Sequence, residues 1–216
     1  MKQKVIAICV LTIFISGCAG MDSKSQSTAL GAGLGCAAGA ILAKATGHNA
    51  AGGCAAGALV GGIAGYEKAR RDELAAAKLA QQDAVSSLPG TKAGDVVTDN
   101  ISVKDKTTGQ VKQVQAFREV SIDLPLSKKG TPEFNSAMDK LKAFAEKVAD
   151  ERGKSEIIVS LAPKDAKAQK ISSETAKFKT ASGKGTVLFS RIADSNVRTG
   201  VERVTVRAAN TGQVEI

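Results

Sequence analysis

"TPEFNSAMDKLKAFAEKVADERGKSEIIVSL", residues 131–161, predicts a helix that leads into a buried strand. Threonine is a favoured helix cap, and proline suits the first helical position because the amide hydrogen it lacks has no helical acceptor there. Apolar residues then recur at helical spacing through Asp150, and Gly153 is expected to end the helix. The recurring positions are Phe134, Met138, Leu141, Ala145 and Val148. The uncharged run "IIVSL" that follows is typical of a buried strand, so the stretch predicts a helix packed on a sheet.

The segments on both sides of this unit extend the predicted sheet. Residues 96–124 contain two alternating stretches separated by Lys106-Thr107-Thr108-Gly109, which indicates a β-hairpin. The elements expected after residue 161 are a loose second helix and two strands, over residues 164–182, 185–192 and 201–209. The order β-β-α-β-α-β-β predicts a small α/β sandwich over residues 90–212, in a chain of the α+β class.

Two helical segments are expected before this domain. Residues 67–88 are charged and rich in alanine, and their Glu, Lys and Arg spacing suits an exposed stalk helix that ends in a linker near residue 88. Residues 30–66 hold glycine at every fourth position in two segments, separated by the turn signal Gly47-His48-Asn49. These glycines are Gly31, Gly35 and Gly39, then Gly53, Gly57, Gly61 and Gly65.

Glycine at this spacing lies along one face of a helix. In lipid, such small-residue faces let helices approach closely, so the stretch predicts a membrane-associating, self-assembling helical hairpin. A flexible, soluble alanine/glycine linker is the alternative. Ile41, Leu42 and Leu59 argue against a linker, whereas Lys44, close to the turn, argues for it.

The cysteines and the histidine indicate no metal or other cofactor. In an antiparallel hairpin Cys36 and Cys54 are offset from each other by roughly 9 Å, at 1.5 Å per residue, which is too far for a disulfide within one hairpin. Both cysteines acting as small buried residues, or a cross-link between subunits, remain open. His48 is the one histidine, so no set of zinc ligands is present.

Residues 1–17 have the organisation of a secretory signal peptide. Two lysines precede the apolar run of residues 5–15, which is shorter than the ~20 residues that a membrane span needs. The run closes with small residues before Cys18. An ordinary secretory signal with a chance cysteine is the alternative to the resemblance described next.

Ile15-Ser16-Gly17-Cys18 resembles the lipobox of bacterial lipoproteins. The resemblance implies cleavage before Cys18, acylation of Cys18 with palmitate-type chains, and a lipidated tether over residues 18–29. The absence of an aspartate after the cysteine implies transport to the outer membrane of a Gram-negative host, with the soluble domain in the periplasm. Two acyl chains already suffice for stable anchoring.

The net charge gives a further indication of partners. It falls from +9 to +7 when the two lysines of the signal are removed, because 28 basic and 21 acidic residues remain. A moderately basic envelope protein suits anionic lipid or cell-wall polymer as a counter-surface. Nucleic acid is not expected, since the chain has one tyrosine, no tryptophan and no recognisable binding motif.

The glycine-rich hairpin of residues 30–66 resembles the glycine-zipper domains of small bacterial envelope lipoproteins. The order of this zipper, a charged helix and an α/β domain resembles envelope lipoproteins that carry an OmpA-like domain. "GTPEFNSAMDKLKAFAEKV" matches the first helix of that domain, "IIVSLAPKD" its central strand, and "GVERVTVRA" its last strand. The turn lacks the histidine and threonine of the family, and "ISSETAKF" lacks its arginine. In the family an aspartate and an arginine hold the diaminopimelate group of peptidoglycan. The resemblance therefore implies Asp165, Lys177 and Arg203 as candidate peptidoglycan contacts.

The function implied is that of a non-enzymatic outer-membrane lipoprotein, anchored by its lipid and hairpin, which forms homo-oligomers and presents a periplasmic interaction domain for envelope structure or integrity. Its partners would be the membrane, copies of itself, and peptidoglycan or another envelope protein. The alternative is a peptidoglycan-binding module that tethers the outer membrane to the cell wall. An enzyme is not expected, because Asp165 and Glu174 lie nine positions apart with no histidine or cysteine nearby.

Overall fold

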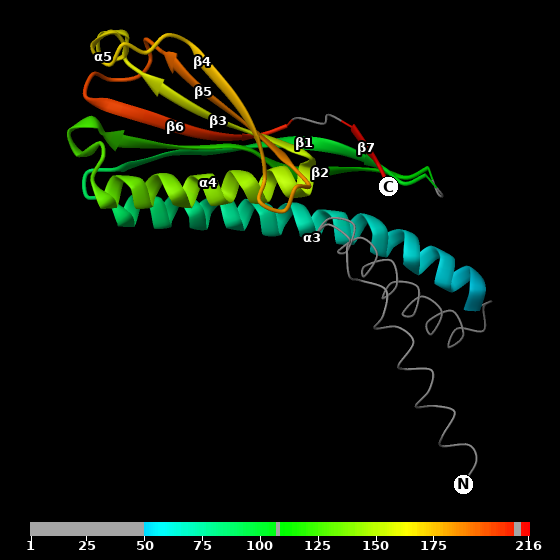
Figure 1. The fold of residues 1–216 in the computed structure, drawn as a ribbon. Coiled ribbons are helices and arrows are strands. Elements are labelled where there is room, and N and C mark those ends of the chain that lie inside the picture. Colours follow the sequence, from blue (N-terminus) through cyan, green and yellow to red (C-terminus); the bar gives the residue numbers. More distant parts are fainter. Residues whose placement is uncertain (1–49, 107–108, 210–212) are drawn as a thin grey trace.

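The computed structural model describes residues 50–106, 109–209 and 213–216, with side chains from residue 62 onward (Figure 1). The signal peptide, the tether and the first half of the expected hairpin lie outside the described residues. The helices are α3 (Ala50–Ser87), the 3-10 turn η2 (Leu126–Lys128), α4 (Pro132–Arg152) and α5 (Pro163–Ala168). The strands are β1 (Lys92–Lys104), β2 (Val111–Pro125), β3 (Lys154–Leu161), β4 (Glu174–Lys179), β5 (Thr186–Ala193), β6 (Val201–Ala208) and β7 (Gln213–Glu215).

The strands form one mixed, seven-stranded sheet in the order β4-β5-β3-β6-β2-β1-β7. Strands β3 and β5 pair in parallel, as do β1 and β7, and the other neighbours are antiparallel. Helices α3 and α4 lie side by side on one face of this sheet (Figure 1). The α+β class and the helix packed on a sheet are thereby confirmed.

Helix α4 has the cap and the stop that its sequence predicts, and four of the five predicted face residues are buried, whereas Met138 is only partly buried. The hydroxyl of Thr131 accepts a hydrogen bond from the amide of Phe134 at 3.2 Å, and Pro132 occupies the first helical position. Gly153 ends the helix in the left-handed conformation, at φ +82°, which glycine adopts without steric cost. The face against the sheet consists of Phe134, Ala137, Leu141, Phe144, Ala145, Val148 and Ala149.

The expectation of an exposed stalk over residues 67–88 is wrong. The helix itself is present, but α3 runs without a break from Ala50 to Ser87 and packs on α4 and β2. Ala77 and Ala84 are fully buried, because their small side chains let α3 approach its neighbours closely. The side-chain amide of Gln81 also donates hydrogen bonds to the carbonyls of Gly94 and Ser121, both at 2.8 Å. This half of α3 is part of the domain.

The expected second helix over residues 164–182 is also wrong in its extent. Only α5 is helical, and Lys170 then adopts a positive φ of 54° that ends the turn. The chain continues into β4, which pairs with β5 and forms one edge of the sheet. Strand β7, at the other edge, was not expected either. The sheet is wider than the sequence predicts, and it has one long helix fewer to cover it.

A second, smaller cluster of buried side chains lies where α3 extends past the end of α4. Tyr66 packs there with apolar residues of the β1–β2 hairpin, and Val214 and Ile216 close the cluster. The hairpin residues are Ile101, Val103, Val114 and Ala116. The cluster holds α3 against the hairpin at the point from which the glycine-rich half of the helix runs away from the sheet (Figure 1).

Candidate functional site

A buried ion network joins α3 to the C-terminal end of α4. Arg152 donates from Nε to Oε1 of Glu73 at 2.8 Å and makes a second hydrogen bond through Nη2. Arg70 donates from Nη1 to Oε2 of Glu73 at 2.8 Å. The side chains of Arg70 and Glu73 are each 1% exposed. Glu73 therefore serves as the common acceptor of two arginines from two helices.

The charges of this network are balanced by a second carboxylate. Oε2 of Glu151 lies 3.9 Å from Nη2 of Arg70, so two arginines face two glutamates. The guanidinium of Arg70 also stands 5.3 Å from the ring centroid of Tyr66, a cation–π geometry. Its Nε and Nη2 atoms are buried and have no hydrogen-bond partner among the described residues. Removing one charge from such a network leaves another buried charge unpaired and strongly destabilises the folded protein. The network therefore fixes the position of α3 along the domain.

Burial raises the pKa of the Tyr66 phenol above its ordinary value. The positive charges of Arg70 and Arg152 act in the opposite direction, and the carboxylate of Glu73 adds a smaller increase. The phenol is therefore neutral in the folded protein well into the alkaline range.

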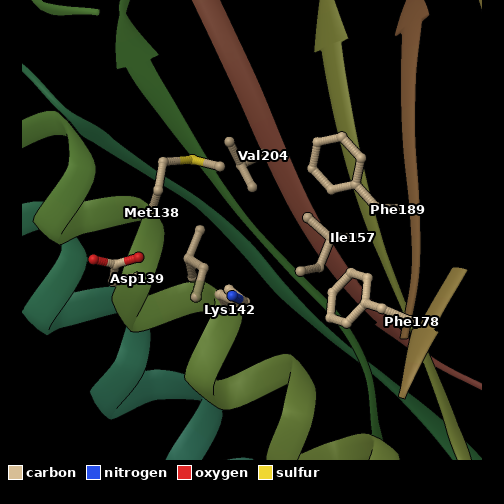
Figure 2. A pocket seen from close by; sticks show the side chains of 8 residues that line it. Met138, Asp139, Lys142, Ile157, Phe178, Phe189 and Val204 are labelled. Atoms are coloured by element: carbon tan, nitrogen blue, oxygen red, sulfur yellow. The ribbon is translucent and has the colours of Figure 1, made fainter. Parts of the chain in front are cut away.

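A half-open groove of about 320 Å³ lies between α4 and the strands β4 and β5 (Figure 2). The lining side chains are mostly apolar, with one carboxylate and one ammonium group. They are Met138, Asp139, Leu141, Lys142, Ile157, Phe178, Phe189 and Val204. Nζ of Lys142 stands 5.8 Å from the ring centroid of Phe178.

The three candidate peptidoglycan contacts do not come together. Oδ2 of Asp165 accepts a hydrogen bond from the amide of Gly200 at 2.7 Å, which ties α5 to the turn before β6. Arg203 forms a two-pronged pair with Asp123, at 2.7 and 3.0 Å, and this contact raises the pKa of Arg203. Lys177 lies on the edge strand β4, which β5 and β3 separate from β6. The structure therefore does not gather the three candidate residues into one site, and their contact with peptidoglycan stays a prediction.

The glycines of the second zipper segment lie in α3. Gly53, Gly57, Gly61 and Gly65 are spaced four apart on this continuous helix, as the sequence predicts. Gly31, Gly35, Gly39 and Cys18 lie outside the described residues. Within the described part of the chain, no helix is both long and apolar enough to cross a membrane. In that same part, no cluster of histidine, cysteine and acidic side chains could hold a metal ion.

Sequence reasoning missed the ion network, although a signal for it was present. Leu74, Ala77, Gln81, Ala84 and Leu88 recur at alternating spacings of three and four, which marks a buried helix face. Arg70 and Glu73 extend that face by one turn. Three of the five marker positions are alanine or glutamine, which weakens the apolar signal.

Comparison with known proteins identifies only the N-terminal third of the chain. No curated protein and no solved structure matches the chain. The model of the YMGG-like Gly-zipper family matches residues 1–69, a range that ends inside α3. The chain is thus similar to YMGG-like Gly-zipper proteins from its first residue to the point where α3 enters the α/β domain.

Proposed function

We propose that this protein is a non-enzymatic outer-membrane lipoprotein whose glycine zipper associates with the membrane and with copies of itself, and which holds its α/β domain in the periplasm as an interaction module. The observation that carries the proposal is that the zipper segment and the α/β domain share one helix, α3. The family match ends at residue 69, whereas α3 continues to Ser87 and forms part of the domain core.

The distribution of charge along α3 supports a membrane-facing first half. Residues 50–66 contain no charged side chain, whereas charged residues recur from Glu67 onward. The change coincides with Tyr66, which is buried under the β1–β2 hairpin. Glycine-rich, uncharged helices pack well against each other in lipid, where bulky side chains would keep the backbones apart. The half of α3 that leaves the domain is therefore the half suited to a membrane or to another zipper.

The interaction role rests on the exposed surface of the α/β domain rather than on its buried charges. The ion cluster around Glu73 is buried and joins α3 to α4, so it is not available to a partner. Another envelope protein is therefore the partner we expect for the exposed surface. The alternative, tethering to peptidoglycan, draws no support from the geometry, because Asp165 and Arg203 are engaged elsewhere and Lys177 lies three strands from Arg203.

Replacement of the lipidation cysteine tests the proposal. Cys18→Ser should abolish incorporation of labelled palmitate, block maturation and shift the protein out of the membrane pellet. Cys36→Ser, a matched change within the zipper, should leave labelling and maturation intact. Normal labelling of the Cys18→Ser protein would refute the lipoprotein assignment.

A second measurement separates the two classes of partner. Purified cell walls should not sediment the mature protein above the level seen with an unrelated basic protein of similar charge. Strong sedimentation that Asp165→Ala abolishes would instead establish the cell-wall tether.

A further inference from the structure

The groove beside α4 exists because the helical layer stops short of the sheet edge. Helix α3 contacts β2 and β1, and α4 contacts β3, β6 and β5, whereas β4 lies beyond both helices. A long second helix would have covered this edge, but the chain forms α5 and β4 there instead. Phe178 and Phe189 are therefore only partly buried, and their rings face the open side of α4 (Figure 2).

The floor of the groove is made of core side chains. Leu141, Ile157 and Val204 are at most 3% exposed, and the thioether of Met138 extends from α4 toward Val204 (Figure 2). Methionine is flexible and polarizable, so it can adjust to an inserted group. A volume of about 320 Å³ is at the small end of ligand sites.

The polar groups of the groove favour one sign of ligand charge. The ammonium of Lys142 points across the groove toward Phe178, whereas the Asp139 carboxylate lies on the helix side, farther from both rings (Figure 2). No ion pair of Lys142 with a carboxylate is found among the described residues. A ligand that brings an anionic group to Lys142 would supply that partner.

We propose that this groove binds the aliphatic chain of a single-chain amphiphile with an anionic head group. The chain would lie over Leu141, Ile157 and Val204 between the two phenylalanine rings, and the head group would contact the ammonium of Lys142. This proposal does not depend on the membrane role of the zipper.

The test uses decanoate and the full, lipidated chain in lipid nanodiscs, labelled with ¹³C at the methionine methyl groups. The mature chain would carry two methionines, Met138 in the groove and Met21 near the lipid anchor. Decanoate, kept below its micellar concentration, should shift the Met138 methyl signal saturably. The methyl signal of Met21 should show only a non-saturable shift, which comes from decanoate that partitions into the bilayer.

A matched pair of lysine variants tests the head-group contact. Lys142→Gln keeps most of the side chain but removes its charge, and it should weaken decanoate binding about threefold to fivefold, as expected for a partly exposed ion pair. Lys140→Gln changes an exposed lysine of the same helix that does not line the groove, and it should leave binding unchanged. Decanol should bind both variants equally, and decyltrimethylammonium should bind more weakly than decanoate.

Three results would overturn the proposal. The first is the absence of a saturable Met138 shift with decanoate. The second is equal affinity for the anionic, neutral and cationic probes, or an equal effect of the two lysine variants. The third is a Met138 shift that appears on concentrating the protein without any probe, which would assign the groove to a second copy of the chain.

Discussion

Arg152, the last residue of α4, binds the carboxylate of Glu73 in α3 across 79 positions of sequence. The contact joins the helix that continues from the glycine zipper to the helix that covers the centre of the sheet. Arg70 shares the same carboxylate, so one glutamate fixes the axial position of α3. The stability of the domain and the attachment of the zipper therefore depend on the same side chain.

Removal of the Glu73 charge should destabilise the protein strongly. Glu73→Gln leaves two arginines facing a neutral amide in a buried site, which typically costs about 3–5 kcal/mol in unfolding free energy. Asp72→Asn is the matched control, because its ion pair with Lys68 is exposed and should contribute less than about 1 kcal/mol. Urea unfolding followed by circular dichroism measures both, and equal effects of the two variants would contradict the role of Glu73.

The two apolar residues on the groove side of α4 should differ in their contribution to stability. Leu141 is fully buried, so Leu141→Ala should cost about 2–5 kcal/mol. Met138 is only partly buried and borders the groove, so Met138→Ala should cost about 1 kcal/mol. Comparable losses in thermal unfolding would mean that the groove is closed in solution.

Gly185 is a position where even a methyl group does not fit. A Cβ atom there would lie 2.4 Å from the backbone carbon of Ala149 and 2.5 Å from its carbonyl oxygen. Gly185→Ala must therefore push the β4–β5 turn away from α4, at a cost of about 1–3 kcal/mol or more. Gly183→Ala, in the same turn, meets open space but requires a φ of +75°, so its cost should stay near 1 kcal/mol. A melting temperature that is lower for Gly183→Ala than for Gly185→Ala would refute the close approach.

Tyr66 should make the protein less stable at alkaline pH. Its pKa is raised in the folded state, so the folded protein holds the phenolic proton more tightly than the unfolded chain does. The resulting stabilisation is fully present below pH ~10 and is lost as the pH rises toward the folded pKa. Tyr66 is the single tyrosine and tryptophan is absent, so tyrosinate absorbance reports this residue alone.

The absorbance titration should therefore have a higher midpoint in buffer than in concentrated urea. Tyr66→Phe should remove the tyrosine-dependent part of the alkaline destabilisation, while lysine deprotonation continues to act in both proteins. Identical midpoints in buffer and in urea would show that Tyr66 is not buried.

Added bulk on the glycine face of the zipper should weaken self-association. Gly57→Leu and Gly61→Leu place large side chains where the four-residue spacing predicts close helix packing. Ala55→Leu adds the same bulk about half a turn away and serves as the control. Native mass measurement in mild detergent should show smaller assemblies for the glycine variants only, whereas unchanged assemblies would favour the flexible-linker interpretation.

Local signals predicted the parts of the fold that depend on neighbouring residues. The cap at Thr131 and the stop at Gly153 act through adjacent backbone groups, so α4 could be located closely. The hairpin turn is also local: the amide of Gly109 donates to the carbonyl of Asp105 at 2.8 Å. The second helix was predicted too long because alanine and lysine favour helices, whereas the pairing of β4 with β5 stabilises a strand there.

The candidate site was less predictable because its contacts join distant segments. The partner of Arg203 is Asp123 on β2, and the partner of Glu73 is Arg152 on α4, and no local pattern indicates either pair. Burial of α3 depends on alanines whose small size is informative only once the opposing surface is known. The groove is open because, in the described part of the chain, no long second helix covers that edge of the sheet. Sequence patterns did not reveal the absence of this helix.

The unbroken course of α3 makes the zipper and the domain share a single helical phase. Each residue of the helix turns it by about 100° and advances it by about 1.5 Å. Deleting one residue between Gly57 and Gly61 would leave every domain contact intact but rotate the upstream glycines by about 100° around the helix axis. Inserting seven residues at the same place would instead leave their direction within roughly 20° of the original. The direction in which the domain faces on a zipper assembly is therefore set by the number of helical residues between the glycine face and the first domain contact.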